Sequence, residues 1–332
     1  MSRALKQFDS DTDILRIAAA FFVVLLHATG TDSRGCLIVN CICRFSVPVF
    51  VLITGRYLLR AEKPWQTCVK KGLRLVGLAV FWAAVYYFYY VLVGEKPAKS
   101  FPVYVLTEPM HYWYLWMAAG LYLLAPMLAV FARSASKSTY LYALLVTALL
   151  GSAVTILLRT ERFSLITEVM ERTKLPTQTG FLFLVLLGAY LQRFRPKVPL
   201  WLWILLFLLG TGLTVGGTMY LSRGAGYDLT LLSFFAPGVL LAGIGFYGAV
   251  CALFGGKTLS PRSASALHSA AGACLGIYLI HSFFFDLLRR FVPYPAFSSE
   301  LLRAVCESVI VFALSAGLCL LLRKIPGVRR LL

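Results

Sequence analysis

Two ionisable side chains in the first apolar run of the chain could do chemistry together. The run extends from Ile14 to His27 and carries Arg16 near its start. Eleven residues return an α-helix to within about 20° of its starting direction, so Arg16 and His27 are expected on one face. They would lie about 16 Å apart along the axis, which is over half of a bilayer core. Ionisable groups at membrane depth are costly and mark functional sites by default.

His27 has two potential partners of its own kind. His111 opens a later apolar run and His281 lies within another, both near the same expected membrane surface. An imidazole can accept and release a proton at neutral pH, which is the chemistry of a general base. The alternative is that these histidines, like the Tyr and Trp of an aromatic belt, simply prefer the headgroup region. That alternative is weakest for His27, because Arg16 shares its face.

Cationic side chains accompany the histidines. Asp13 precedes Arg16 by about one helical turn and can orient its guanidinium. A guanidinium binds phosphate through a planar fork, whereas an arginine that merely anchors a helix would snorkel to the interface. Arg44 and Arg56 lie near the two ends of the next apolar run. Pro48 between them is expected to kink that helix and open a cavity.

Cations at one end of a site and an imidazole at the other suit a long anionic donor. A coenzyme A thioester carries phosphates at one end and a reactive acyl carbon at the other, with an extended arm between them. We expect Arg16, and with it Arg56, to bind such a donor from the cytoplasm. His27 would deprotonate an acceptor hydroxyl or help to pass the acyl group outward. This geometry does not by itself exclude a proton-coupled transporter.

The elements that must position these groups are membrane helices. The chain has 332 residues, of which 59% are apolar and 14% charged, whereas a soluble domain carries about a quarter charged residues. The net charge of +18 is spread over short loops, which favours the positive-inside rule over nucleic-acid binding. The eight cysteines form no C-x-x-C pair. We expect them to be small core residues, not metal or disulfide ligands.

Ten apolar runs predict an all-α integral membrane protein with about ten transmembrane helices. With both termini cytoplasmic, the inner segments hold 18 Lys and Arg residues and the outer segments hold 10. The sixth run is short enough to be re-entrant, but the basic cluster after it indicates that it crosses. We expect one membrane-embedded domain over residues 1–332. The runs are 14–29, 37–59, 73–93, 112–131, 140–158, 179–191, 199–221, 229–254, 269–288 and 301–322.

Four motifs resemble the acyltransferase 3 family of integral membrane acyltransferases. That family has an Arg and a His separated by ten residues in its first helix, after an Asp, as in Asp13, Arg16 and His27. The second motif is Val47-Pro-Val-Phe-Val-Leu-Ile-Thr-Gly55 with Arg44 upstream. Here Thr54-Gly55-Arg56 replaces the usual Ser-Gly-Tyr and adds a cation. The remaining two motifs are His111-Tyr-Trp-Tyr-Leu, followed by Tyr122 and Pro126, and Leu275-Gly-Ile-Tyr-Leu-Ile-His281.

The resemblance implies transfer of an acyl group, usually acetyl from acetyl-CoA, to a hydroxyl of a lipid-linked or exported glycan. Acetyl-CoA would be a donor substrate, with no permanently bound cofactor or metal. The partners would be acyl-CoA, the saccharide acceptor and membrane lipids, without nucleic acid. The protein would be a multi-pass protein of the bacterial plasma (inner) membrane, laid out like stand-alone members without an appended extracytoplasmic domain.

The resemblance also implies roles for individual residues. His27 and Arg16 would be catalytic, with His27 as the base. The other residues would bind the donor or position the acceptor and the thioester carbonyl. They are Asp13, Arg44, Arg56, His111, Trp113, Tyr278 and His281.

A transporter or exporter remains the second interpretation, with His and Arg residues relaying protons or binding anions. No internal repeat is visible, and we expect no acidic residue at depth in the helices, because the clear acidic residue of the run 269–288 is Asp286, near its outer end. Both observations favour an enzyme. A scaffold without chemistry would give no account of Arg16 and His27 on one face.

Overall fold

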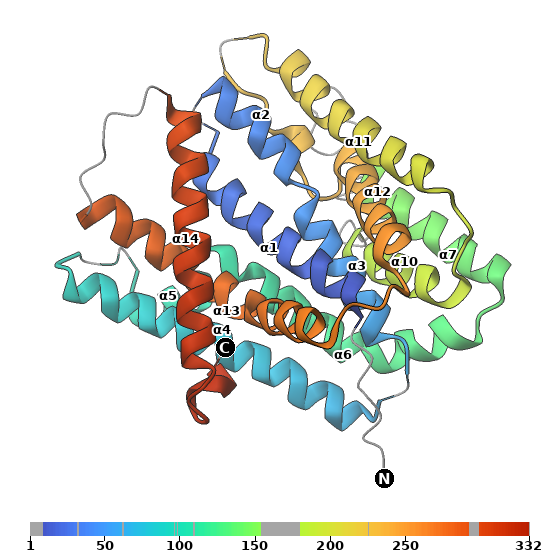
Figure 1. Cartoon of the computed structure of the whole chain (residues 1–332), viewed down its shortest axis with the longest axis horizontal. Helices are drawn as coiled ribbons and strands as arrows, with labels where there is room; N and C mark the ends of the chain where they lie inside the picture. The colour runs from blue at the N-terminus through green and yellow to red at the C-terminus, as the bar shows by residue number, and fades with distance from the viewer. Residues whose placement is uncertain are drawn as a thin grey trace.

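The computed structural model describes residues 9–153, 180–291 and 299–331, apart from residues 32, 62, 96, 98, 109 and 225. These residues form helices and connecting turns without a strand (Figure 1). Eight helical segments among them are long and apolar enough to cross a membrane, which confirms the all-α integral membrane fold. In chain order the elements are α1 (Ser10–Thr29), α2 (Arg34–Cys43), α3 (Ser46–Leu58), α4 (Trp65–Leu92), α5 (Phe101–Thr107), η1 (Met110–Tyr112), α6 (Trp113–Ser134), α7 (Lys137–Ala148), η2 (Leu149–Ala153), α10 (Gly180–Phe194), α11 (Leu200–Leu221), η4 (Thr230–Leu232), α12 (Pro237–Phe254), α13 (Pro261–Phe291), α14 (Glu300–Leu322) and η5 (Val328–Leu331).

Two of the ten predicted crossings differ from the other eight. The fifth apolar run is described as α7 followed by the π-helical turn η2, and its end lies outside the described residues. The sixth run is α10, a helix of 15 residues that is shorter than the spanning segments. Ten crossings therefore remain a prediction. The expected outer loop over 159–178, and Arg3 and Lys6 of the expected inner terminus, also lie outside the described residues.

The second apolar run is interrupted, as Pro48 predicts. Helix α2 ends at Cys43 and α3 begins at Ser46, so Arg44 lies in the break four residues before the proline. A proline ring clashes with the carbonyl four residues earlier and cannot donate a backbone hydrogen bond. The Ser46 hydroxyl donates to the carbonyl of Cys43 at 2.8 Å, which satisfies a group that the break leaves free.

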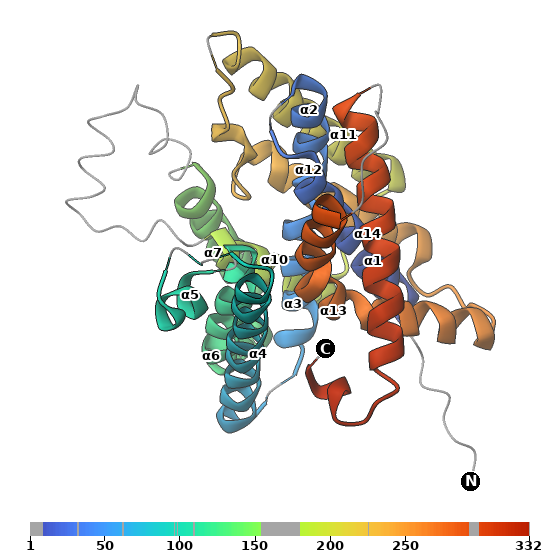
Figure 2. The same cartoon turned by 90° about the vertical axis from the view of Figure 1, so that its left-hand side faces the viewer.

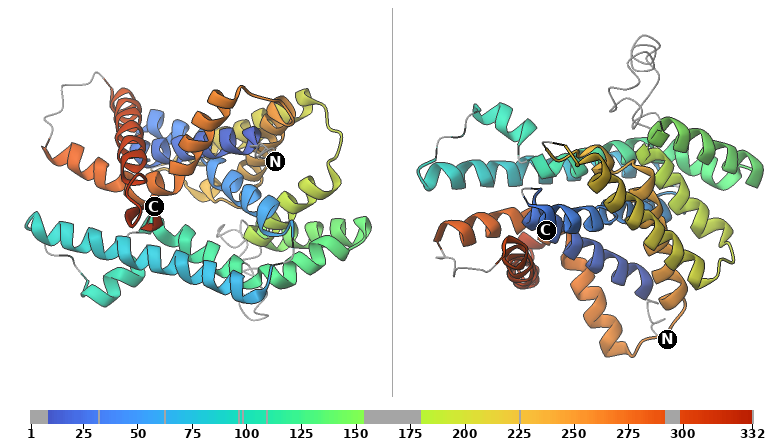
Figure 3. Two further views of the ribbon diagram at one scale, coloured as in Figure 1. Left: turned by 60° about the horizontal axis from the view of Figure 1, so that its bottom comes forward. Right: turned by 90° about the horizontal axis from the view of Figure 1, so that it is seen from above.

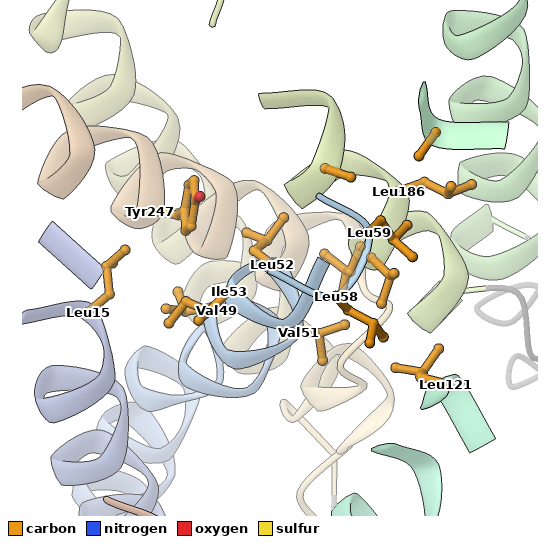
Figure 4. Packing of buried hydrophobic residues seen from close by; sticks show 14 of the residues in the cluster. Leu15, Val49, Val51, Leu52, Ile53, Leu58, Leu59, Leu121, Leu186 and Tyr247 are labelled. Atoms are coloured by element: carbon orange, nitrogen blue, oxygen red, sulfur yellow. The ribbon is translucent and has the colours of Figure 1, made fainter. Parts of the chain in front are cut away.

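Helix α3 lies at the centre of the larger hydrophobic core. Figure 4 shows Leu52 and Val49 of α3 between Leu15 of α1, Tyr247 of α12 and Leu186 of α10. Helices α3 and α10 pack closely, and each has a glycine at the contact with the backbone of the other. A Cβ on Gly55 would lie 2.0 Å from the carbonyl oxygen of Val185, and one on Gly188 would lie 2.1 Å from that of Leu52. Small residues of this kind let membrane helices approach each other closely.

Helix α1 is the hub on which the functional residues converge. It packs against α2, α3, α12, α13 and α14. On the other side of the molecule α4 and α6 lie side by side, with α5 next to them (Figures 2 and 3). Helix α5 and the turn η1 fall in the stretch that the sequence predicts as the outer loop 94–111, so that loop is more ordered than expected.

Candidate active site

Three histidines from three elements meet at the Thr29 end of α1. The ring centroids of His27 and His281 are 5.1 Å apart, those of His111 and His281 are 5.1 Å apart, and those of His27 and His111 are 6.2 Å apart. We call these three residues the histidine cluster. The sequence predicts that the three residues share a depth in the membrane, and the structure brings their rings together.

The three imidazoles differ in access and in hydrogen bonding. His281 is fully buried and His111 is half-buried, whereas His27 is exposed. The Nε2 atom of His111 is buried without a hydrogen-bond partner. An exposed imidazole flanked by two others is the member of the cluster that can reach a substrate. His27 is thus exposed and lies next to the imidazole rings of His111 and His281.

The tautomer of His281 follows from its backbone contacts. Its Nδ1 atom lies 2.8 Å from the carbonyl oxygen of Tyr278 and 3.2 Å from that of Ile277. Because carbonyl oxygens only accept hydrogen bonds, Nδ1 must carry the proton. A neutral His281 then presents its Nε2 lone pair as an acceptor.

Two tyrosines shape α13 around His281. The hydroxyl of Tyr86 donates to the carbonyl of Leu279 at 3.2 Å and accepts from the amide of Phe283 at 2.9 Å. Those two backbone groups are four residues apart, the spacing of an ordinary helical hydrogen bond. The hydroxyl of Tyr112 also donates to the Leu279 carbonyl, at 2.8 Å. Side chains inserted into a helical ladder bend it, and α13 is visibly bent in Figures 2 and 3.

Neighbouring contacts fix His111. The Tyr278 hydroxyl donates to the carbonyl oxygen of His111, which ties η1 to α13. The rings of Tyr278 and Tyr112 lie 5.8 Å and 4.3 Å from that of His111. Tyr278 therefore contacts His111, one of the residues with which the sequence groups it.

Arg44 is tethered beside His27 through an asparagine. Its Nε atom donates to Asn40 Oδ1 at 3.0 Å, and Asn40 Nδ2 donates to the carbonyl of Leu26 at 3.0 Å. Leu26 is the residue before His27, so the guanidinium and the imidazole are held from one turn of α1. Among the described residues Arg44 has no ion-pair partner. Its charge is therefore available to an anionic or polarised substrate group.

An aromatic stack connects Trp113 with Arg44. The guanidinium of Arg44 lies 5.5 Å from the ring centroid of Phe234, and Phe234 stacks on Trp113 at 5.4 Å. Phe181 stacks on Trp113 at 5.5 Å. Trp113 is thus part of a group of stacked aromatic rings that packs beside Arg44. Cation–π contact holds a guanidinium without neutralising it.

The other end of α1 contains carboxylates. Asp13 is buried and lies 3.7 Å from Arg16. The guanidinium carbon atoms of Arg16 and Arg56 lie 5.7 Å and 5.6 Å from the ring centroid of Tyr57. Arg56 differs from Arg16 because its Nη1 atom forms a 2.7 Å ion pair with the buried Asp11. Arg56 is thus less available to a donor than the sequence suggests.

Sequence reasoning missed several residues with clear roles in this arrangement. Asn40 and Phe234 hold Arg44, and Asp11 pairs with Arg56. His268 was not assigned a role, although its Nδ1 atom lies 3.0 Å from Asp13. Asp11 and Asp13 are two residues apart on a helix, so they point in different directions and reach different partners. That spacing is the one signal that the sequence offered.

The expectation that the helices hold few acidic residues at depth is wrong. Glu307 lies on α14, is buried, and pairs with Arg289 at 2.9 Å and with Arg303 at 3.5 Å. A run that is apolar on average hides a single carboxylate that a neighbouring helix neutralises.

Among the described residues, no three His, Cys, Asp or Glu side chains are arranged to hold a metal ion. Six of the eight cysteines are buried, as small core residues are.

The structure is a polytopic helical membrane fold with three imidazoles at one end of the central helix α1 and cations at the other. A family model described as an acyltransferase domain, that of acyltransferase 3, matches residues 9–324. The chain belongs to this family and is a membrane acyltransferase. Comparisons with curated proteins and with solved structures gave no match.

Proposed function

We propose that the protein is an O-acetyltransferase of the bacterial plasma (inner) membrane. It moves an acetyl group from cytoplasmic acetyl-CoA to a hydroxyl of a cell-surface or lipid-linked glycan. The observation that carries this proposal is the exposed His27 within the histidine cluster, on the same helix as Arg16. About 16 Å of helix separates the two side chains, which suits a donor with its phosphates at Arg16 and its thioester at His27.

In the reaction, His27 acts as a general base. Its free imidazole nitrogen removes the proton from the acceptor hydroxyl, and the oxygen attacks the thioester carbonyl carbon. The carbon–sulfur bond then breaks, and the imidazolium returns the proton to the leaving CoA thiolate. The products are an O-acetyl ester and free CoA. General-base catalysis of this kind contributes about 10²–10⁴-fold to a rate.

Arg44 supports the step in which negative charge develops on the carbonyl oxygen. A fixed cation without a carboxylate partner stabilises such charge strongly in a site of low dielectric. The tether through Asn40 holds the guanidinium ready before the substrate arrives. His111 and His281 add nitrogen atoms that can position the acceptor or the thioester.

The donor role falls mainly on Arg16. Its side chain is partly exposed, and its partner Asp13 lies at the limit of an ion pair, 3.7 Å away. Arg56 is committed to Asp11 at 2.7 Å. We therefore assign Arg56 to holding α3 against α1, and Arg16 to binding phosphate.

A glycan acceptor is supported by the sequence resemblance. The layout resembles stand-alone members of the family, such as the enzyme that acetylates enterobacterial common antigen. An acceptor of that kind presents hydroxyls at the membrane surface, on the side where the histidine cluster is expected.

One observation favours transport as a second candidate. Glu307 is a carboxylate at membrane depth of the kind that proton-coupled carriers use. Its 2.9 Å contact with Arg289 is that of a structural ion pair, so we prefer the enzyme.

The test combines donor binding with turnover. Acetyl-CoA binding is measured on the purified protein in nanodiscs, and release of free CoA on membrane vesicles that contain the cell's own glycans. We expect His27→Ala to bind acetyl-CoA normally and to release CoA at least 100-fold more slowly. Arg16→Ala should lose binding. Arg262→Ala, a change at an exposed arginine of α13, is the matched control and should behave as wild type.

Two results would contradict the proposal. If the wild type binds no acyl-CoA, the transporter becomes the better interpretation. If His27→Ala acetylates glycan at the wild-type rate, His27 is not the base.

A further inference from the structure

Basic side chains from two helices contact Asp13 at the Ser10 end of α1. Asp13 Oδ1 lies 3.7 Å from Arg16 Nη1, and Asp13 Oδ2 lies 3.0 Å from His268 Nδ1 on α13. The Asp13 side chain is 4% exposed, whereas those of Arg16 and His268 are 36% and 54% exposed. The carboxylate is therefore buried beneath two basic groups that remain accessible.

Arg323, which follows α14, is the third basic group. Its Nη1 atom donates to the carbonyl of Ser269 at 3.1 Å, one residue after His268. The guanidinium lies against Gly272, where a Cβ would be 2.3 Å from Nη1. Only glycine leaves this space on α13. Within the residues that the structure covers, Arg323 has no ion-pair partner.

We call Arg16, His268 and Arg323 the cationic cluster. Arg16 and His268 both contact Asp13, and Arg323 donates to the residue after His268, so the three groups lie in a common region. Two guanidinium groups outnumber the single carboxylate, and the His268 imidazole adds a further hydrogen-bonding group. An accessible surplus of positive charge with planar, fork-shaped donors is suited to phosphate groups.

Distance along the helices orders the three basic groups relative to the histidine cluster. Arg16 is eleven residues, or about 16 Å, from His27, and His268 is thirteen residues, or about 20 Å, from His281. His268 contacts Asp13, which lies about one turn beyond Arg16 on α1, so His268, and Arg323 beside it, are the more remote from the reacting end. On an acyl-CoA donor the phosphate farthest from the thioester is the 3′-phosphate of the nucleotide.

We propose that His268 and Arg323 bind the nucleotide 3′-phosphate of the donor and make the enzyme prefer acyl-CoA over its 3′-dephospho form. This proposal rests on acyl-CoA being the donor. Arg16 then binds the diphosphate, and Asp13 fixes Arg16 and His268 in place. Gly272 matters because it leaves room for the Arg323 guanidinium.

The experiment measures the affinities of acetyl-CoA and 3′-dephospho-acetyl-CoA by calorimetry, on the full chain in nanodiscs of zwitterionic lipid. The wild type should bind acetyl-CoA at least tenfold more tightly than the dephospho form. Arg323→Gln and His268→Asn should weaken acetyl-CoA by about 5- to 30-fold and leave the dephospho form unchanged, so that discrimination is largely lost. Lys324→Gln removes the same charge one residue further on and should discriminate as wild type does.

Gly272→Ala keeps the charge and tests the geometry. Alanine is favourable within a helix, so this variant should fold and should lose discrimination as Arg323→Gln does, because its methyl group displaces the guanidinium. The proposal is overturned if the wild type binds acetyl-CoA while all three variants discriminate normally. It is also overturned if the variants change only the retention of anionic lipid, since the cluster would then bind headgroups. A wild type that binds neither nucleotide refutes the acyl-CoA donor itself.

Discussion

The histidine cluster and the cationic cluster, at opposite ends of α1, hold their ionisable groups in different ways. His27, His111 and His281 contact one another and backbone carbonyls, and in the described part of the chain no carboxylate pairs with them. At the other end Asp11 and Asp13 each hold an arginine. Imidazoles without a carboxylate remain free to exchange protons, whereas paired guanidiniums remain charged and fixed.

From this difference we expect changes in the two clusters to affect different kinetic parameters. Changes in the histidine cluster should lower kcat, because proton transfer belongs to the transition state. Changes at Arg16 or in the cationic cluster should raise KM for the donor. Changes to ion pairs beside the clusters should alter stability alone.

The largest effect that would sharpen this comparison is expected for Arg56→Met. It leaves the buried Asp11 carboxylate without its ion-pair partner, which costs about 3–5 kcal/mol of unfolding free energy. The measurement is denaturant unfolding in detergent, together with acetyl-CoA affinity per folded molecule, which should not change. The double variant Asp11→Leu/Arg56→Met removes both charges and should recover most of the stability. A stable Arg56→Met protein with weakened donor binding would return Arg56 to the donor site, as the sequence alone suggested.

An intermediate effect is expected for Asn40→Ala. Arg44 loses its tether to α1, and the transition state loses about 1.4 kcal/mol, or tenfold in kcat, with KM for acetyl-CoA unchanged. Steady-state CoA release measures both parameters. Ser33→Ala is the control. Ser33 caps α2, the helix that carries Asn40, by accepting from Cys36 N at 3.3 Å, and it makes no hydrogen bond to Arg44 in the described part of the chain. Equal loss of kcat in the two variants would mean that Asn40 acts only through the stability of α2.

The smallest effect is expected for Tyr112→Phe. The Leu279 carbonyl keeps its bond from Tyr86, so the loss should be no more than about 1 kcal/mol of stability, with kcat within about twofold of wild type. Tyr86→Phe removes bonds to both Leu279 and Phe283 and should cost more. If the two phenylalanine variants are equally active and equally stable, the bend of α13 does not depend on Tyr86.

Much of the fold follows from the sequence, because a continuous stretch of apolar residues is enough to predict a membrane helix. Apolar run length predicts the eight long helical segments, and Pro48 predicts the break in which Arg44 lies. The histidines at a common depth follow from helix periodicity and the positive-inside rule. The contacts of Asn40, Phe234 and Glu307 could not be predicted, because each depends on which helix lies beside which. Likewise, the sequence shows Asp11 and Asp13 near the start of α1, but it does not show that Asp11 forms an ion pair with Arg56.

The Tyr86 hydroxyl has a consequence for how α13 is solvated. Bent helices commonly admit a water molecule between a carbonyl and the amide four residues later, and that water exchanges with its surroundings. In this protein a phenol occupies that position, between Leu279 and Phe283. The Tyr86 hydroxyl, which belongs to α4, makes the hydrogen bonds that a water molecule would make there, but it cannot diffuse away. The bend beside His281 is therefore held by a side chain of the protein that does not exchange with solvent.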